Sequence, residues 1–242
     1  MGANTNVNRT STRDETARGI RRRAAQIVIT MLIQVAIMFG AAGSLNWGMA
    51  WAFIGVQLGV LAANSFVLLR KDPALIAERA QGREGAKNWD KVLALIVSLI
   101  GPLSVYLVSG LDRRYGWSQP PALAVELISL LVVALGYALW GWAMASNRYF
   151  SGLVRIQKER GHTVSTAGPY RLVRHPGYAG LILWTLATPL ALGTLWAFVP
   201  AGLTVVAIVV RTALEDSTLR KELAGYDNYA RQVRYRLLPG VW

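Results

Sequence analysis

Cysteine is absent from this chain of 242 residues, and charged side chains are scarce in it. The lack of thiols excludes disulfides, thiolate catalysis, thiolate metal sites and palmitoylation. Only 16% of the residues are charged whereas 53% are hydrophobic, which is too apolar for an ordinary soluble domain of this size. With two His and no Cys, we expect no metal site.

Nucleotide-binding signatures are missing as well. No Gly-x-Gly-x-x-Gly sequence follows a strand pattern, and the segment 82–87 lacks the spacing of a phosphate-binding loop. A nucleotide-like cofactor would therefore have to bind without a Rossmann domain.

Long apolar runs are the dominant feature of the sequence. A membrane-spanning helix needs about 20 apolar residues. Runs of that length occur at 24–45, 47–69, 92–111 and 122–145. A fifth run, 178–210, is long enough for two helices, with Pro189, Gly193 and Pro200 at the bend. We therefore predict an all-α, polytopic membrane helix bundle of about six transmembrane helices.

The basic residues are divided unevenly between the predicted loops. All of the 26 Lys and Arg residues except Arg113 and Arg114 fall on one side of six crossings. The positive-inside rule makes that side cytoplasmic, with both termini on it, and we expect a bacterial inner membrane. Membrane orientation and contact with anionic lipid headgroups then explain the net charge of +13. Nucleic acid is not expected as a partner, because the basic residues are spread over several loops.

Three parts of the chain follow from these patterns. Residues 1–23, rich in Asn, Thr, Ser and Arg, are expected to be a disordered, basic, cytoplasmic N-terminus. Residues 24–145 are expected to form the first four transmembrane helices. Residues 146–242 would hold a cytoplasmic C-terminal catalytic region with a motif loop, a transmembrane hairpin and a final helix. Glu126, near the start of the fourth run, is assigned a structural role.

The densest polar motifs flank the last hydrophobic hairpin. Residues 168–180 read Gly-Pro-Tyr-Arg-Leu-Val-Arg-His-Pro-Gly-Tyr-Ala-Gly, and residues 211–216 read Arg-Thr-Ala-Leu-Glu-Asp. Folding the hairpin back on itself would bring both segments to one membrane face. Pro176 disfavours helix at His175, so an extended turn should lead into a helix that starts at Gly177. The unpaired N–H groups of that helix start suit a carboxylate.

These motifs resemble the isoprenylcysteine carboxyl methyltransferase family and the related membrane phospholipid N-methyltransferases. The similarity covers about residues 145–242. Besides Gly-x-Tyr-x-x-x-Arg-His-Pro-x-Tyr-x-Gly, it includes Gln157, Glu159, His162, Thr166, Arg211, Glu215, Asp216, Leu219, Tyr226, Tyr229, Val233 and the segment 237–240. The family usually has two glutamates where this chain has Glu215 and Asp216.

The resemblance implies an S-adenosylmethionine-dependent methyltransferase with its cofactor reached from the cytoplasm. The acceptor would be a lipophilic small molecule, a prenylated chain or a lipid, reached from the bilayer and most simply a carboxylate. Catalytic roles are implied for Arg211 and Glu215. Cofactor contacts are implied for Gln157, His162, Arg174, His175, Tyr178, Gly180, Glu215 and Tyr229.

Alternatives remain at this stage. A phospholipid N-methyltransferase would share the motif, and so would an NADPH-dependent membrane sterol or steroid reductase. Those reductases typically have Arg-Asp followed by Cys and a Lys-Tyr-Gly stretch, which this chain lacks. A non-catalytic accessory protein with the same fold is the third possibility.

The acidic pair after the hairpin has two interpretations. Arg211 and Glu215 are four residues apart and share one helix face. Either they form an ion pair at the interface, or Glu215 contacts a cationic or hydroxyl-bearing part of the cofactor while Arg211 orients the acceptor by bidentate hydrogen bonding. Asp216 points about 100° away round the helix, and we expect it to act as a cap or to pair with Arg174.

Overall fold

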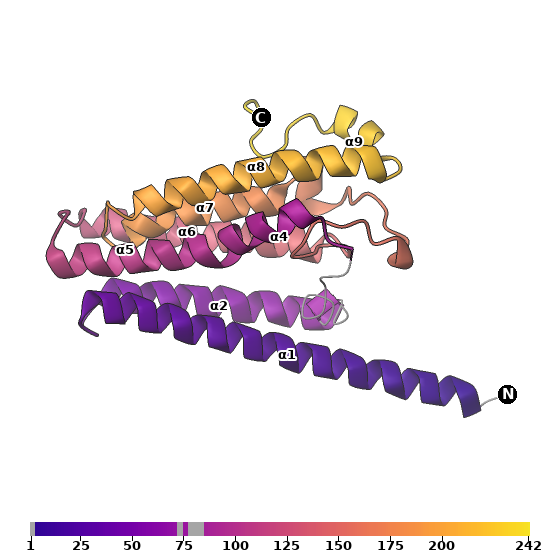
Figure 1. The fold of residues 1–242 in the computed structure, drawn as a ribbon, viewed down its shortest axis with the longest axis horizontal. Coiled ribbons are helices and arrows are strands. Elements are labelled where there is room, and N and C mark those ends of the chain that lie inside the picture. Colours follow the sequence, from indigo (N-terminus) through magenta and orange to yellow (C-terminus); the bar gives the residue numbers. More distant parts are fainter. Residues whose placement is uncertain (1–2, 72–74, 77–84) are drawn as a thin grey trace.

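The computed structural model describes residues 3–71, 75–76 and 85–242, with side chains from residue 16 onward, and has no strand in these ranges (Figure 1). The α-helices of the described ranges include α1 (Ala3–Ala42), α2 (Gly48–Lys71), α4 (Asn88–Leu95), α5 (Gly101–Tyr115), α6 (Leu123–Ala145), α7 (Pro176–Ala191), α8 (Phe198–Glu222) and α9 (Tyr226–Gln232). A π-helical turn, η1 (Ile96–Ile100), joins α4 to α5, and two short 3-10 turns are η2 (Lys158–Arg160) and η3 (Gly168–Arg171). The predicted all-α membrane bundle is thereby confirmed.

Five segments are long and apolar enough to cross a membrane. They are 16–42 of α1, α2, the continuous run 88–115, α6 and α8. The chain is a multi-pass integral membrane protein. The remaining predicted crossing, α7, has only 16 residues. At 1.5 Å per residue it is about 24 Å long, short of a hydrocarbon core of about 30 Å.

The bend of the last hairpin falls where the sequence predicts it. Gly193 adopts a φ of 71° between α7 and α8, a conformation that glycine reaches without steric cost. Pro189 lies in the last turn of α7, and Pro200 lies in the first turn of α8. The hairpin returns the chain to the end of the bundle from which α7 starts (Figure 1).

The beginning of the chain differs from its prediction. Disorder is expected over 1–23, whereas the structure has α1 helical from Ala3. The first proline of the sequence is Pro73, so no helix-breaking residue separates this polar stretch from the apolar one behind it. Once a helix exists, each added residue gains a hydrogen bond without a new nucleation cost.

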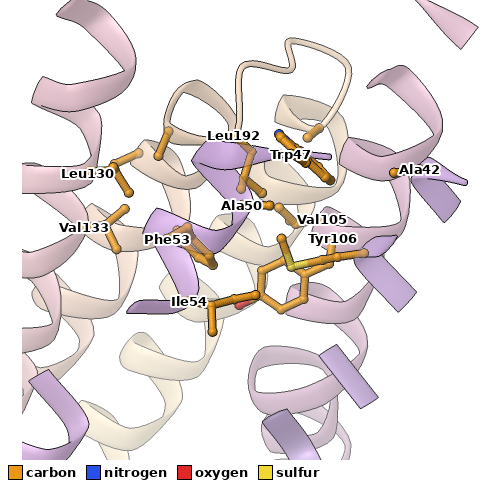
Figure 2. Packing of buried hydrophobic residues seen from close by; sticks show 14 of the residues in the cluster. Ala42, Trp47, Ala50, Phe53, Ile54, Val105, Tyr106, Leu130, Val133 and Leu192 are labelled. Carbon is orange, nitrogen blue, oxygen red and sulfur yellow. The ribbon is translucent and has the colours of Figure 1, made fainter. Parts of the chain in front are cut away.

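The helices are arranged in layers (Figure 1). Helix α1 packs on α5, α2 packs on α6, and α8 lies on the side of the bundle away from α1, with α9 near its end. Close approaches occur at glycines: a Cβ on Gly110 of α5 would lie 2.6 Å from the Met38 carbonyl oxygen of α1. The largest apolar core includes Trp47, Phe53 and Leu192, so it sits toward the end where the short turns lie (Figure 2). The two polar motif segments lie toward the opposite end.

Candidate active site

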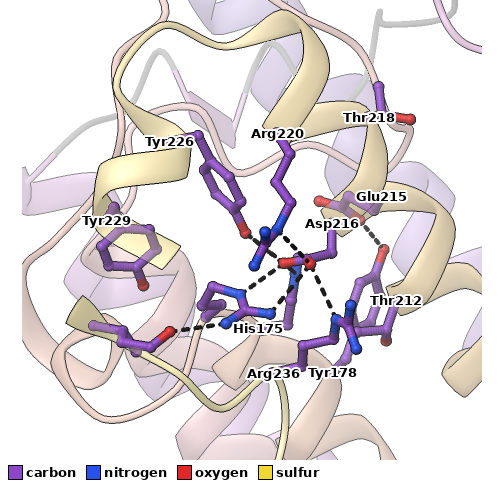
Figure 3. Close-up of polar contacts among 12 residues, drawn as sticks. His175, Tyr178, Thr212, Glu215, Asp216, Thr218, Arg220, Tyr226, Tyr229 and Arg236 are labelled. Atoms are coloured by element: carbon purple, nitrogen blue, oxygen red, sulfur yellow. Dashed lines mark hydrogen bonds and ion pairs between the residues drawn. The ribbon is translucent and has the colours of Figure 1, made fainter. Parts of the chain in front are cut away.

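The hairpin brings the two polar motifs together, one at the start of α7 and the other near the end of α8. The helix begins one residue earlier than predicted, at Pro176, with His175 as a non-helical N-cap (φ −126°, ψ 59°). Tyr178, in the first turn of α7, donates a hydrogen bond from its hydroxyl to Glu215 Oε2 at 2.5 Å (Figure 3). Glu215 and Tyr178 are both half-buried. These two predicted site residues therefore meet, although they are 37 positions apart.

Arg211 is held by a residue that the sequence analysis missed. Its Nε and Nη2 donate to the Asp90 carboxylate of α4 at 2.6 and 3.0 Å, and Nη2 also donates to the Gly152 carbonyl at 2.8 Å. Arg211 thus forms its ion pair with Asp90 and not with Glu215, which was one of its two interpretations. The bidentate edge of the guanidinium is already taken by Asp90, although the guanidinium carbon lies 5.5 Å from the Tyr178 ring centroid.

Asp90 could have been noticed from its position. It lies two residues before the apolar run that starts at Val92. An acid inside a membrane helix is costly unless it is paired, so it calls for a cationic partner. In the structure Asp90 is fully buried, and it also accepts a 2.6 Å hydrogen bond from the Val154 backbone N–H. It therefore fixes both α8 and the loop before α7.

Asp216 is the centre of a second ion cluster (Figure 3). It is fully buried. Arg174 donates to its two oxygens at 2.7 and 3.1 Å, and Arg236 donates at 3.0 Å. His175 Nε2 and the Tyr226 hydroxyl lie 3.2 and 3.0 Å from Oδ1. The predicted pairing of Asp216 with Arg174 is confirmed.

The pKa of Tyr226 follows from this environment. Burial and the adjacent Asp216 carboxylate raise the pKa of the Tyr226 hydroxyl far above its ordinary value. The hydroxyl therefore stays protonated and remains a hydrogen-bond donor to Asp216. Because Tyr226 belongs to α9, this bond fastens α9 to α8.

The cluster also fastens the C-terminal segment. Arg174 Nη1 donates to the carbonyls of Val233 and Arg234 at 2.8 and 2.7 Å. The backbone N–H groups of Arg174 and His175 donate to the carbonyls of Tyr235 and Arg236, each at 2.9 Å. Arg174, predicted as a cofactor contact, thus uses most of its donors to hold the chain end over the start of α7.

Two predicted cofactor residues form a separate group around Tyr149. Gln157 is fully buried, and its Nε2 donates to the Tyr149 carbonyl at 2.8 Å. The His162 ring lies 4.4 Å from the Tyr149 ring, and its Nδ1 accepts from the Gln157 backbone N–H at 3.3 Å. Burial, with Arg160 and Arg155 nearby, lowers the pKa of His162, so the ring is neutral and can accept this bond.

The last two predicted residues have clear packing roles. Gly180 faces α6, and a Cβ there would lie 2.5 Å from the Gly136 carbonyl oxygen. Tyr229 donates from its hydroxyl to the Tyr170 carbonyl at 2.7 Å. Among the predicted residues in the described part of the chain, Glu215 and Tyr178 therefore make the fewest contacts that hold other segments in place.

A family of known proteins matches the part of the chain that contains these residues. Residues 127–221 match the sequence profile of the isoprenylcysteine carboxyl methyltransferase (ICMT) family. The match covers less than half of the chain. It contains α7, most of α6 and α8, and both motif segments.

Individual isoprenylcysteine O-methyltransferases are also similar to the chain. The chain is 36% identical over 69 residues to a probable protein-S-isoprenylcysteine O-methyltransferase of Oryza sativa subsp. indica, covering 28% of this chain and 36% of the relative. It is 28% identical over 161 residues to a protein-S-isoprenylcysteine O-methyltransferase of Schizosaccharomyces pombe, covering 59% of this chain and 66% of the relative. The chain thus spans about a third of the rice relative and about two thirds of the yeast relative.

A reductase is also similar to the chain. The Delta(14)-sterol reductase TM7SF2 of Mus musculus is 26% identical over 136 residues, covering 51% of this chain and 32% of the relative. Because the chain is similar both to isoprenylcysteine O-methyltransferases and to this reductase, a cofactor measurement is needed to separate the two activities.

Proposed function

We propose that this chain is a membrane methyltransferase that uses S-adenosylmethionine and methylates a lipophilic carboxylate, as in isoprenylcysteine carboxyl methylation. The observation that carries the proposal is the hydrogen bond between Tyr178 and Glu215. It joins the two motif segments within the region that matches the ICMT family model. Both side chains are half-buried, Tyr178 in the first turn of α7 and Glu215 near the end of α8, which fits a site at the border between the bilayer and the aqueous phase.

The residues around Glu215 fit such a cofactor. When bound, S-adenosylmethionine supplies a methyl group activated on a positively charged sulfur. A half-buried carboxylate that accepts one hydroxyl still has acceptor capacity for a ribose hydroxyl or an ammonium group. His175 and the start of α7 lie beside it, and the partial positive charge of a helix N-terminus favours a carboxylate. We assign cofactor contacts first to Glu215, Tyr178 and His175.

Arg211 is proposed to position the acceptor rather than to clamp it. Asp90 occupies the bidentate edge of the guanidinium, whereas Nη1 has no hydrogen-bond partner among the described residues. Nη1 is therefore the atom that would meet an acceptor carboxylate. Holding both reactants in reactive geometry can contribute about 7 to 11 kcal/mol to lowering a barrier.

The membrane orientation belongs to the same proposal. The N-terminus of α1 and the active-site end of α8 lie toward the same end of the bundle (Figure 1). With the distribution of Lys and Arg, this supports a cytoplasmic site, cytoplasmic termini and location in a bacterial inner membrane. The cofactor would then enter from the cytoplasm and the acceptor from the bilayer.

Cofactor binding tests the proposed activity. S-adenosylhomocysteine and NADPH are each titrated into purified protein in detergent, and binding is followed by calorimetry and by the melting temperature. We expect S-adenosylhomocysteine to bind and to raise the melting temperature, since a ligand selective for the folded state stabilises it. Binding of NADPH without a response to S-adenosylhomocysteine would instead establish the reductase alternative.

The acceptor class needs a second measurement. Purified protein is incubated with methyl-labelled S-adenosylmethionine and a membrane lipid extract, and the labelled products are identified by mass spectrometry. A base-labile methyl ester is the product expected from carboxyl methylation. A base-stable methylamine in a phospholipid headgroup would show that the chain is a phospholipid N-methyltransferase.

A further inference from the structure

A cavity with a cluster of polar side chains on its wall lies inside the membrane-spanning part of the bundle, away from the ion clusters. Its volume is about 130 Å³, and its wall is contributed by α1, α2, η1, α5, α6 and α7. The polar side chains on this wall include Gln34, Gln57, Tyr106 and Tyr137. Gln34, Gln57 and Tyr106 are each at least nine-tenths buried, so these groups are well removed from the surface of the bundle.

The four side chains are hydrogen-bonded to one another around Gln57. Its amide contacts Gln34 at 2.6 Å, the Tyr137 hydroxyl at 2.6 Å and the Tyr106 hydroxyl at 3.2 Å. Within the described residues, these side chains make one further hydrogen bond, from Gln34 Nε2 to the Met38 sulfur at 3.8 Å. The network thus links α1, α2, α5 and α6 across the cavity wall.

This network has more polar hydrogens than acceptors that use them. Each Gln amide carries two N–H hydrogens and each Tyr hydroxyl carries one. The three contacts within the network and the contact to Met38 use at most four of these hydrogens. At least two therefore have no acceptor among the described residues, whichever way the amides are turned. In a membrane interior water is scarce, so such groups call for another acceptor.

The cavity is open toward the lipid along one side. Thr30 of α1 and Ser98 and Leu99 of η1 lie on its wall and are exposed. η1 is a π-helical turn, an irregularity that is rare inside helices and frequent at functional sites. A ligand in the bilayer can therefore reach the network laterally, between α1 and η1.

We propose that this cavity binds a carbonyl or ester oxygen carried by an otherwise apolar lipid chain. The surplus of hydrogens selects an acceptor oxygen, and the absence of charged residues from the cavity wall selects an uncharged ligand. The volume is similar to that of an apolar protein cavity of about 150 Å³ that holds one benzene molecule. The site therefore takes a short section of the lipid that includes the carbonyl.

This cavity is distinct from the methyl-transfer site. Trp184 lines the cavity, and Tyr178 belongs to the proposed active site. Both side chains pack against the buried cluster of Val97, Leu181 and Ile208, but neither Tyr178 nor Glu215 lies on the cavity wall. The inference does not depend on methyl transfer, because it rests on the network and the cavity alone.

Photolabelling with a matched pair of probes tests the proposal. One probe is methyl palmitate with a diazirine beside the ester, and the other is the corresponding alkane with the diazirine at the same carbon. Each is added to the full chain in detergent and irradiated, and labelled peptides are mapped by mass spectrometry. We expect the ester to label peptides containing Gln34 and Ser98 at least fivefold more than the alkane. Equal labelling by the two probes would mean that the ester oxygen is not recognised and would overturn the proposal.

Variants show whether the network is responsible. Tyr137→Phe removes one of the two hydroxyl hydrogens that have no acceptor, and Gln57→Leu removes the amide that orients both hydroxyls. Each variant should lower ester labelling toward the alkane level. Tyr115→Phe, at an exposed residue on the end of α5, should leave it unchanged. If Gln57→Leu does not fold, the Tyr137→Phe variant alone shows whether the network is responsible for ester labelling. Unreduced ester labelling in a folded Tyr137→Phe variant would overturn the inference. S-adenosylhomocysteine binding is measured on the same preparations, so that failure of the proposed function is seen separately.

Discussion

Arg211 and Asp90 are 121 positions apart in the sequence and are joined by two hydrogen bonds of 2.6 and 3.0 Å. The carboxylate is fully buried, and the guanidinium is nearly so. Through this pair, α8 is tied to α4 next to the active-site end of the bundle. The pair thereby sets the position of the last membrane helix relative to the third crossing.

The Arg211–Asp90 pair predicts a strong energetic coupling. Arg211→Ala and Asp90→Ala should each lower the free energy of unfolding by about 3 to 5 kcal/mol, because each leaves a buried charge without its partner. The double variant should lose less than the sum of the two. The measurement is a double-mutant cycle of unfolding in mixed detergent micelles. Additive losses would contradict the coupling.

An exposed ion pair on the same two parts of the chain serves as the control. Lys87 and Glu222 are 2.6 Å apart, but their side chains are 34% and 41% exposed. Exposed pairs contribute about 0 to 1 kcal/mol, so Lys87→Ala and Glu222→Ala should change stability little. A loss as large as that of Asp90→Ala would show that burial is not the cause.

Local patterns were sufficient to predict some of these relationships. The proline rule placed the start of α7 within one residue, and the angular offset of Asp216 on its helix was enough to predict its pairing with Arg174. Arg211 was assigned to an acceptor because no sequence pattern pairs it with Asp90. Asp90 comes from another crossing, and the packing of one membrane helix against another leaves little local signal in the sequence. The same holds for the C-terminal segment, which is held by backbone carbonyls that carry no sequence pattern.

The proposed cofactor contact of Glu215 is tested by a neutral replacement. Glu215→Gln should weaken S-adenosylhomocysteine binding about ten- to a hundredfold, because losing a hydrogen bond to a charged group costs about 1.5 to 3 kcal/mol. Binding is measured by calorimetry in detergent. Glu222→Gln, at an exposed acid on the same helix, is the control and should bind as the wild type does. Equal affinities for the two variants would remove Glu215 from the cofactor site.

Arg211→Lys separates positioning of the acceptor from binding of the cofactor. Lysine keeps a charge for Asp90 but lacks the planar fork, so the group that faces the acceptor is lost. Turnover should fall by more than tenfold while S-adenosylhomocysteine affinity stays within a few fold. The comparison with Glu215→Gln decides the point, since a common loss of cofactor affinity in both would contradict separate roles.

The Asp216 cluster should control access to the C-terminal segment. Asp216→Ala removes the carboxylate that pairs with Arg174 and Arg236, so the segment after α9 should open more often. Trypsin should then cut after Arg234 or Arg236 at least tenfold faster, as followed by mass spectrometry. Asp227→Ala, at an acid that is 48% exposed, should leave cleavage unchanged. Similar rates in both variants would mean that the cluster does not hold the segment.

Gly180 distinguishes a packing role from a cofactor contact. Gly180→Ala would place a Cβ 2.5 Å from the Gly136 carbonyl and force α6 and α7 apart. We expect a destabilisation of about 1 to 3 kcal/mol, seen as a lower melting temperature in detergent. Gly59→Ala in α2, where nothing lies within 4 Å of the added carbon, should cause no loss. An unchanged melting temperature with weaker S-adenosylhomocysteine binding would assign Gly180 to the cofactor site instead.

The turns at the end of the bundle opposite the active site should lie outside the cytoplasm. These turns contact one another: Arg113 donates to the Asn46 carbonyl, and the Leu195 backbone N–H donates to the Ser118 hydroxyl, each at 3.0 Å. They therefore share one membrane face, whatever the depth of the short helix α7. Because that face carries only Arg113 and Arg114 of the 26 basic residues, the positive-inside rule places it outside.

Single cysteines can test this orientation, since the chain has none of its own. Ser118 is a poor position because its hydroxyl and N–H both bind Asp112, whereas Gln119 is exposed. In intact cells, Gln119→Cys should react with a membrane-impermeant maleimide. Thr166→Cys, in the exposed loop before α7, should react only after the membrane is opened. The reverse pattern would invert the topology and place the Glu215 site away from cytoplasmic S-adenosylmethionine, so this labelling experiment also bears on the proposed activity.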